Sequence, residues 1–119
     1  MMFERAEIFR EANERLPGPP GLLASVIGIT SDMLAAAQAN EWASVTADEA
    51  RRRVMLEQCF AEPVKPEYSE VFAEALAVLL HMNEELTALL MEARKTIAEE
   101  GHQALKNGAK LAHYLDIQS

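Results

Sequence analysis

A row of apolar residues at helical spacing, between Phe72 and Ile97, constrains the fold of this chain more than any other feature. The steps along the row alternate between four and three residues, and its members are Phe72, Leu76, Leu79, Asn83, Leu86, Leu90, Ala93 and Ile97. Such a heptad seam predicts one helix that packs lengthwise against another. A second apolar row flanks the first and consists of Val71, Ala75, Val78, Met82 and Leu89. A helix that is apolar over so wide an arc needs partners on two sides, so we expect a helical protein that forms a dimer or larger species.

Composition narrows the class of protein. A chain of 119 residues is long enough for one domain with a modest core. The formal net charge of -8 opposes nonspecific binding to nucleic acid or to an anionic membrane, because both need clustered Lys and Arg. The single cysteine, Cys59, cannot form an intrachain disulfide and fits a reducing cytoplasm. We expect neither a signal peptide nor an apolar run of the roughly 20 residues that a membrane span needs.

Proline and glycine divide the chain into helical segments. The cluster at 17–21 cannot continue a helix, Pro66 is suited to a first helical turn, and Gly101 is suited to a helix end. The predicted helices cover about 2–16, 21–39, 41–61, 66–99 and 103–116. The prediction is an all-α fold, an antiparallel helical bundle or hairpin with one long helix and a short C-terminal lid helix. Residues 1–20 form an N-terminal helical extension and its linker, and 21–119 form the main domain.

The start of the third helix has two interpretations. Asn40 can cap a helix that begins at Glu41, or Thr46 and Glu49 can form a capping box and start the helix later. We favour Asn40, because Trp42 and Val45 then share one broad stripe with the later apolar residues of the helix.

The order of several motifs resembles the FliT family of small flagellar type III export chaperones. These motifs are Leu22-Leu23, Met33-Leu34, Glu41-Trp42, Val45, Glu49-x-x-Arg52, Met55-Leu56, Phe60, Leu79-Leu80, Asn83, Leu86, Arg94 and Tyr114. They cover about residues 22–116. The extension of 1–20 lies before the usual start of the family.

The resemblance implies a cytoplasmic bacterial chaperone that holds the C-terminal region of the filament-cap protein and delivers it to the export gate. Some proteins of this kind also bind the export ATPase or a flagellar master regulator. In the family the terminal helix covers the binding groove and moves aside for partners. The residues that we expect to line a partner groove between the third and fourth helices are Val45, Leu56, Phe72, Leu76, Leu79 and Leu86. The expected lid residues are Leu105, Leu111, Tyr114 and Leu115.

Two other functional classes stay open at this point. One is a structural homo-oligomeric bundle without a client, and the other is an anti-activator of a transcription complex. No nucleophile motif, phosphate loop or cofactor motif is recognisable, so we expect no enzyme activity and no cofactor. Glu99 with His102, and His81 with Glu84, are read as surface residues rather than as metal ligands.

Several further residues have a purely structural interpretation beside a functional one. Cys59 is expected to be a small buried hydrophobe rather than a reactive thiol. Glu49 and Arg52 form either a plain surface pair or a pair that orients the helix hairpin, and Arg51-Arg52-Arg53 is expected to be a solvated face. Asn83 either fixes the register of the seam or stays hydrated at its edge.

Overall fold

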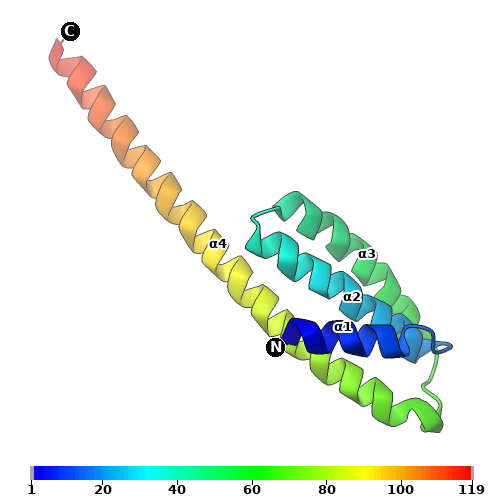
Figure 1. The fold of residues 1–119 in the computed structure, drawn as a ribbon. Coiled ribbons are helices and arrows are strands. Elements are labelled where there is room, and N and C mark those ends of the chain that lie inside the picture. Colours follow the sequence, from blue (N-terminus) through cyan, green and yellow to red (C-terminus); the bar gives the residue numbers. More distant parts are fainter. Residues whose placement is uncertain (1, 119) are drawn as a thin grey trace. The chain divides into compact units, whose positions relative to one another are not determined.

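The computed structural model describes the backbone of residues 2–118 and the side-chain surroundings of residues 7–109. Within 2–118 it contains α-helices and one short 3-10 helix and no β-strand, which confirms the all-α prediction (Figure 1). The elements are α1 (Met2–Asn13), α2 (Pro19–Gln38), α3 (Trp42–Ala61), the 3-10 helix η1 (Pro66–Tyr68) and α4 (Ser69–Gln118). The chain divides into two compact units, residues 1–87 and 88–119, and α4 contributes residues to both.

Helix α2 is the core of the first unit. It packs against both α1 and α3 (Figure 1), and nearly all of its residues from Pro19 to Ala37 are buried. Its side chains Leu23, Ile27, Met33 and Leu34 are at most 1% exposed. Contrary to the expectation from the sequence, α2 is long and apolar enough to cross a membrane by length and composition, but 78% of that stretch is buried inside the protein. A core helix of a soluble protein meets the same criterion.

The turn between α2 and α3 corrects the predicted role of Asn40. Asn40 has a φ of 59° and makes no side-chain cap, and α3 begins after Glu41 instead. The Glu41 N–H donates to the Ala36 carbonyl at 2.8 Å, and the Asn40 N–H donates to the Ala37 carbonyl at 3.1 Å. This pair of hydrogen bonds with a left-handed residue is a Schellman motif. Asn40 therefore ends α2 rather than starting α3, and the early start of α3 itself is confirmed.

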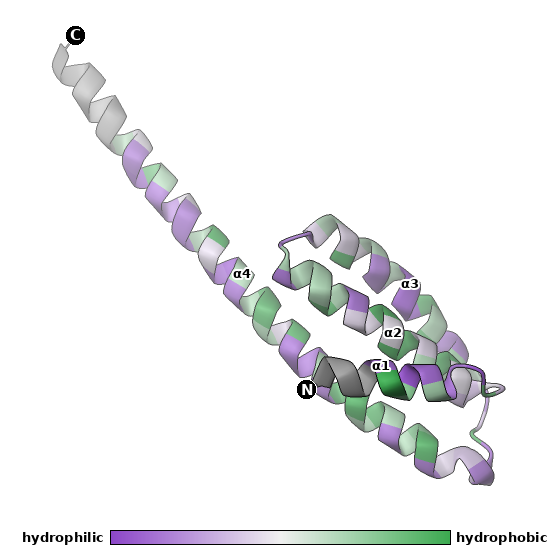
Figure 2. Ribbon diagram, viewed as in Figure 1, coloured by the Kyte–Doolittle hydropathy of each residue, from purple (hydrophilic) through white to green (hydrophobic). Residues whose placement is uncertain are grey.

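The C-terminal helix differs most from the prediction. Helix α4 is continuous from Ser69 to Gln118, so the break at Gly101 and the separate helix over 103–116 were wrong. Of the glycines, only Gly18 has a positive φ, whereas a helix-ending glycine adopts that conformation. An isolated glycine weakens a helix by roughly 1 kcal/mol but does not end it, and the turns on both sides of Gly101 contain good helix formers. Hydrophobic and hydrophilic residues alternate along α4 (Figure 2).

Candidate partner-binding surface

The predicted seam is buried along the first turns of α4. Phe72, Ala75, Leu79, Met82 and Leu86 are between 0 and 9% exposed. Phe72 also meets Phe60 of α3 edge-to-face, with ring centroids 6.1 Å apart and an interplanar angle of 86°. Within the first unit, both predicted apolar rows therefore contribute to the protein's own core.

The six groove residues predicted from the sequence lie at this same packed region. Val45, Phe72, Leu79 and Leu86 are buried, and Leu56 and Leu76 are half-buried. Four of the six thus lie in the interior of the first unit, and the other two lie at its edge. Whether a partner contacts them is not tested by this arrangement, so their role stays a prediction.

A buried arginine joins three helices. Arg52 of α3 is 9% exposed, and its Nη1 donates to Thr30 Oγ1 on α2 at 3.2 Å and to Asn83 Oδ1 on α4 at 2.7 Å. Its Nη2 donates to Glu49 Oε2 at 2.6 Å. The Thr30 hydroxyl in turn donates to the Val26 carbonyl at 2.8 Å, so it accepts from one side and donates to the other. We call Thr30, Glu49, Arg52 and Asn83 the Arg52 network.

The Arg52 network decides between the alternatives that the sequence left open. Arg51 and Arg53 are exposed as expected, but Arg52 is not part of a solvated face. Asn83 is half-buried and its side-chain oxygen accepts a hydrogen bond from Arg52, which supports a role in the register of α4 with α3. The role of Thr30 was missed, because Arg52 lies 22 residues away in the sequence. The signal in the sequence was a threonine among the apolar residues of this helix, because a hydroxyl on an apolar face needs a hydrogen-bond partner.

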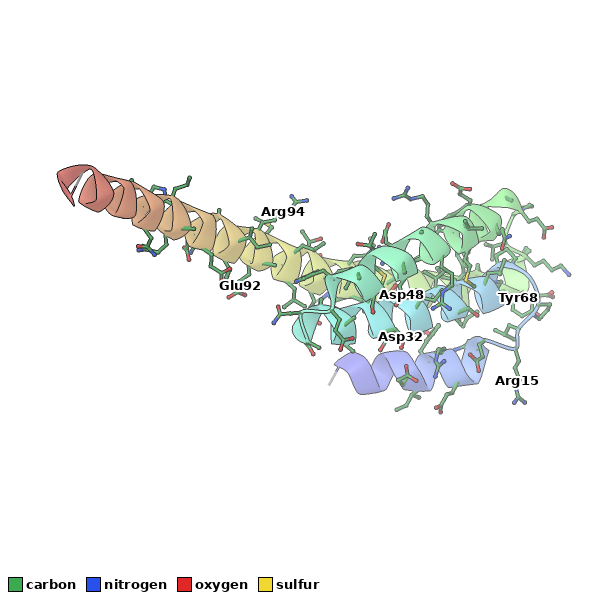
Figure 3. The ribbon with its side chains drawn as sticks, turned by 90° about the horizontal axis from the view of Figure 1, so that it is seen from above. Arg15, Asp32, Asp48, Tyr68, Glu92 and Arg94 are labelled. Carbon is green, nitrogen blue, oxygen red and sulfur yellow. The ribbon has the colours of Figure 1, made fainter. Side chains whose placement is uncertain are left out.

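Three large apolar side chains on the later turns of α4 are exposed, to an extent that only Leu80, at 63%, reaches on the earlier turns. Met91 is 66% exposed, Ile97 63% and Leu105 76%. Figure 3 shows Glu92 and Arg94 projecting from the same helix, so polar and apolar side chains alternate around it. Met91, Ile97 and Leu105, which we call the exposed α4 row, belong to residues 88–119. They provide apolar contacts of the kind that a partner helix can cover.

The predicted lid falls on this same stretch. Leu105 belongs to the exposed α4 row and is the one lid residue whose surroundings the structure describes. The side chains of Leu111, Tyr114 and Leu115 lie outside the described residues. The lid assignment therefore stays a prediction.

Reactive chemistry has little support in the described part of the chain. Cys59 is 0% exposed, which confirms the prediction of a buried thiol, and burial raises its pKa. Among the residues searched, no three His, Cys, Asp or Glu side chains are grouped to hold a metal ion. His81 Nδ1 and Glu84 Oε2 lie 3.7 Å apart, and both side chains are well exposed.

A cleft of about 240 Å³ lies at the loop end of the first unit and is lined by Pro17, Gly18, Pro19, Pro20, Glu62, Pro63, Lys65 and Tyr68.

Comparison with known protein families gives a match over most of the chain. The model of the family described as flagellar protein FliT matches residues 22–115. The matched segment contains nearly all of α2, all of α3 and most of α4, and it leaves out α1. Comparison with curated proteins and with solved structures found no match.

Proposed function

The chain belongs to the FliT family of flagellar proteins, and from this premise we propose that it is a cytoplasmic export chaperone for the filament-cap protein. Membership of the family supports a role in flagellar export in general. The proposal adds the client, which is the C-terminal region of the cap protein. In this role the chaperone prevents premature assembly of the cap protein and delivers it to the type III export apparatus.

The exposed α4 row is the observation that carries the proposal. An amphipathic client helix would place its apolar face on Met91, Ile97 and Leu105, which together leave far more apolar surface in water than the buried turns of α4 do. In helix-in-groove recognition, the anchors at i, i+3, i+4 and i+7 belong to the client helix, and the chaperone supplies the apolar surface that they contact. The apolar row of α4 continues from the buried Leu86 to the exposed Ile97. A client could therefore extend the seam that the chain already uses in its own core.

In this proposal the client contacts the groove predicted from the sequence only after it has bound to the exposed α4 row. Phe72, Leu79 and Leu86 are buried, so a client reaches them only if α3 and the early turns of α4 separate. The Arg52 network opposes that separation, because opening would break the 2.7 Å hydrogen bond between Arg52 and Asn83. Contact with the exposed α4 row would come first, and contact with the groove would follow.

The proposal is tested by titrating the chain with a peptide from the C-terminal region of the cap protein. We expect Ile97→Asp to weaken binding at least tenfold, because a carboxylate would be desolvated in an apolar contact. Thr96→Asp is the matched control, since it adds the same charge at the neighbouring exposed position. Both variants should keep the helicity of the parent, because neither position is buried. Equal affinities for the parent and both variants would place the client surface elsewhere, and no binding by the parent would reject the client.

A C-terminal gate is the regulatory part of the proposal. In such a gate residues 103–116 would cover the groove, and Gly101 and Gly108 are the residues of this stretch of α4 with the lowest helix propensity. Tyr114 would then bury its ring and keep its hydroxyl at a wet edge. Tyr114→Ala should tighten client binding while the helical content stays nearly unchanged. Weaker binding by this variant would instead place Tyr114 in the client contact itself.

The proposal also includes partners other than the cap protein. We propose the export ATPase, the export gate and a flagellar transcription regulator as candidates, since all would meet the chaperone in the cytoplasm. A pull-down from the host with and without the cap protein separates these from a clientless homo-oligomeric bundle. Recovery of the chain alone in both cases would favour the bundle.

A further inference from the structure

Helix α1 lies on α2 through an unusual contact. A Cβ added at Gly28 would stand 2.4 Å from Arg10 Cδ and 3.6 Å from Arg10 Cγ. The methylene stem of Arg10 therefore lies directly on the backbone of α2, in the space that a side chain at position 28 would fill. Glu7 and Glu14 hold the guanidinium of Arg10 at 2.6 Å and 4.0 Å. We call this contact surface on α2, around Gly28, the Gly28 seat. It accommodates a helix with a long side chain opposite Gly28, as α1 has in Arg10.

The side chains of residues 7–13, the part of α1 whose surroundings the structure describes, are only partly covered. Within residues 7–13 of α1 no side chain is buried, and Ile8 is 67% exposed. Most of the residues of α2 beneath it, by contrast, are buried. Arg10 Nε is buried without a hydrogen-bond partner, which further reduces the gain from docking. Segments with few buried apolar contacts detach or unfold locally far more easily than the whole domain unfolds.

The linker between α1 and α2 closes only because two glycines allow it. Gly18 has φ 70° and ψ -147°, a region of backbone conformation that is accessible essentially to glycine alone. At Gly21, an added Cβ would stand 2.0 Å from the Leu16 carbonyl oxygen, so the linker passes directly over the first turn of α2. Prolines 17, 19 and 20 stiffen the same stretch. An extended linker would need neither glycine.

From these contacts we infer that α1 is exchangeable between two copies of the chain, so that the α1 of each copy occupies the Gly28 seat of the other. Exchange keeps every contact between Arg10 and Gly28 and changes only the linker, which is why such exchange is a low-cost route to dimers. Short, constrained linkers favour it. The inference concerns α1, which lies outside the matched family segment, and it does not rest on the client proposed above.

A cysteine pair tests the exchange in the full chain. In a Cys59→Ala background, Arg10→Cys with Gly28→Cys puts two thiols within reach of a disulfide and removes the stem that would clash. Oxidation followed by non-reducing electrophoresis separates a bridge within one chain from a bridge between two. We expect bridged dimers, and while the dimer is the minor species the ratio of dimer to monomer should rise about tenfold for a tenfold rise in protein concentration, by mass action. Bridges confined to single chains at every concentration, or no bridge at all, would overturn the inference.

Glycine variants supply a second test of the exchange, and it needs no engineered cysteine. Gly18→Ala and Gly21→Ala strain only the closed linker, so each should raise the dimer-to-monomer ratio by about tenfold in sedimentation. Gly28→Ala is the control, because it crowds the seat equally in both forms and should not raise the ratio. If all three variants sediment like the parent, the linker does not control association and the exchange is rejected.

Discussion

The Arg52 network predicts a measurable energetic coupling between α3 and α4. Replacing Arg52 by Ala removes the three hydrogen bonds to Thr30, Asn83 and Glu49 together with the packing of the arginine stem. Glu49 is 38% exposed and can return to water, and Asn83 is half-buried, so the loss should stay below that of a fully buried pair. We expect unfolding to become easier by about 3 kcal/mol.

Replacing Asn83 by Ala is a smaller perturbation. Arg52 keeps its bonds to Thr30 and Glu49 and loses only the 2.7 Å bond to the amide oxygen. A hydrogen bond to a charged group contributes about 1.5 kcal/mol at the lower end of its range. In the double variant Arg52→Ala with Asn83→Ala that bond can be lost only once. The losses of unfolding free energy in the two single variants, added together, should therefore exceed the loss in the double variant by about 1 kcal/mol or more.

Urea unfolding followed by circular dichroism measures these differences. Arg51→Ala is the control from the adjacent position, since Arg51 is 60% exposed and its pair with Asp48 at 3.3 Å is worth less than about 0.5 kcal/mol. Additive losses for Arg52 and Asn83 would contradict the reasoning. In that case the arginine would not tie α3 to α4 in solution.

Three further outcomes follow from the structure. Gly101→Ala should stabilise the helix by about 0.5–1 kcal/mol, because α4 is continuous there and an added Cβ meets nothing within 4 Å; a loss of helicity would restore the predicted break. Cys59 should react with a thiol reagent only on unfolding, since its side chain is 0% exposed and burial raises its pKa; rapid reaction of the folded chain would contradict this placement. If the apolar arc of α4 mediates self-association at micromolar concentration, Met91→Asp should shift sedimentation toward the monomer, and a parent that is monomeric throughout would reject the prediction.

Leu79→Asp is an unsuitable probe of the partner groove that the sequence predicts. Leu79 is only 5% exposed, so an aspartate there would desolvate a charge inside the core and unfold the first unit. Loss of client binding by this variant would not identify a contact. Exposed positions such as Ile97 separate binding from folding.

Local chemistry was enough to determine the class of fold and most helix boundaries. The alternating steps of three and four from Phe72 onward, and the proline and glycine cluster at 17–21, act over a few residues and need no partner. Helices α2 and α3 consequently begin and end within two residues of the prediction. The burial of Cys59 followed from its place on an apolar stripe in the same way.

The folded structure decided the features for which local preferences were balanced, and for Arg52 it did so through residues far away in the sequence. Asn40 can cap either of two helices, and the hydrogen bonds to Ala36 and Ala37 assign it to the end of α2. Gly101 can end a helix or continue one, and no positive φ occurs there. Arg52 reads as a surface residue in a run of arginines until Thr30 and Asn83, far away in the sequence, supply its partners. A buried charge is stable only where distant groups converge on it, and that convergence exists only in the folded chain.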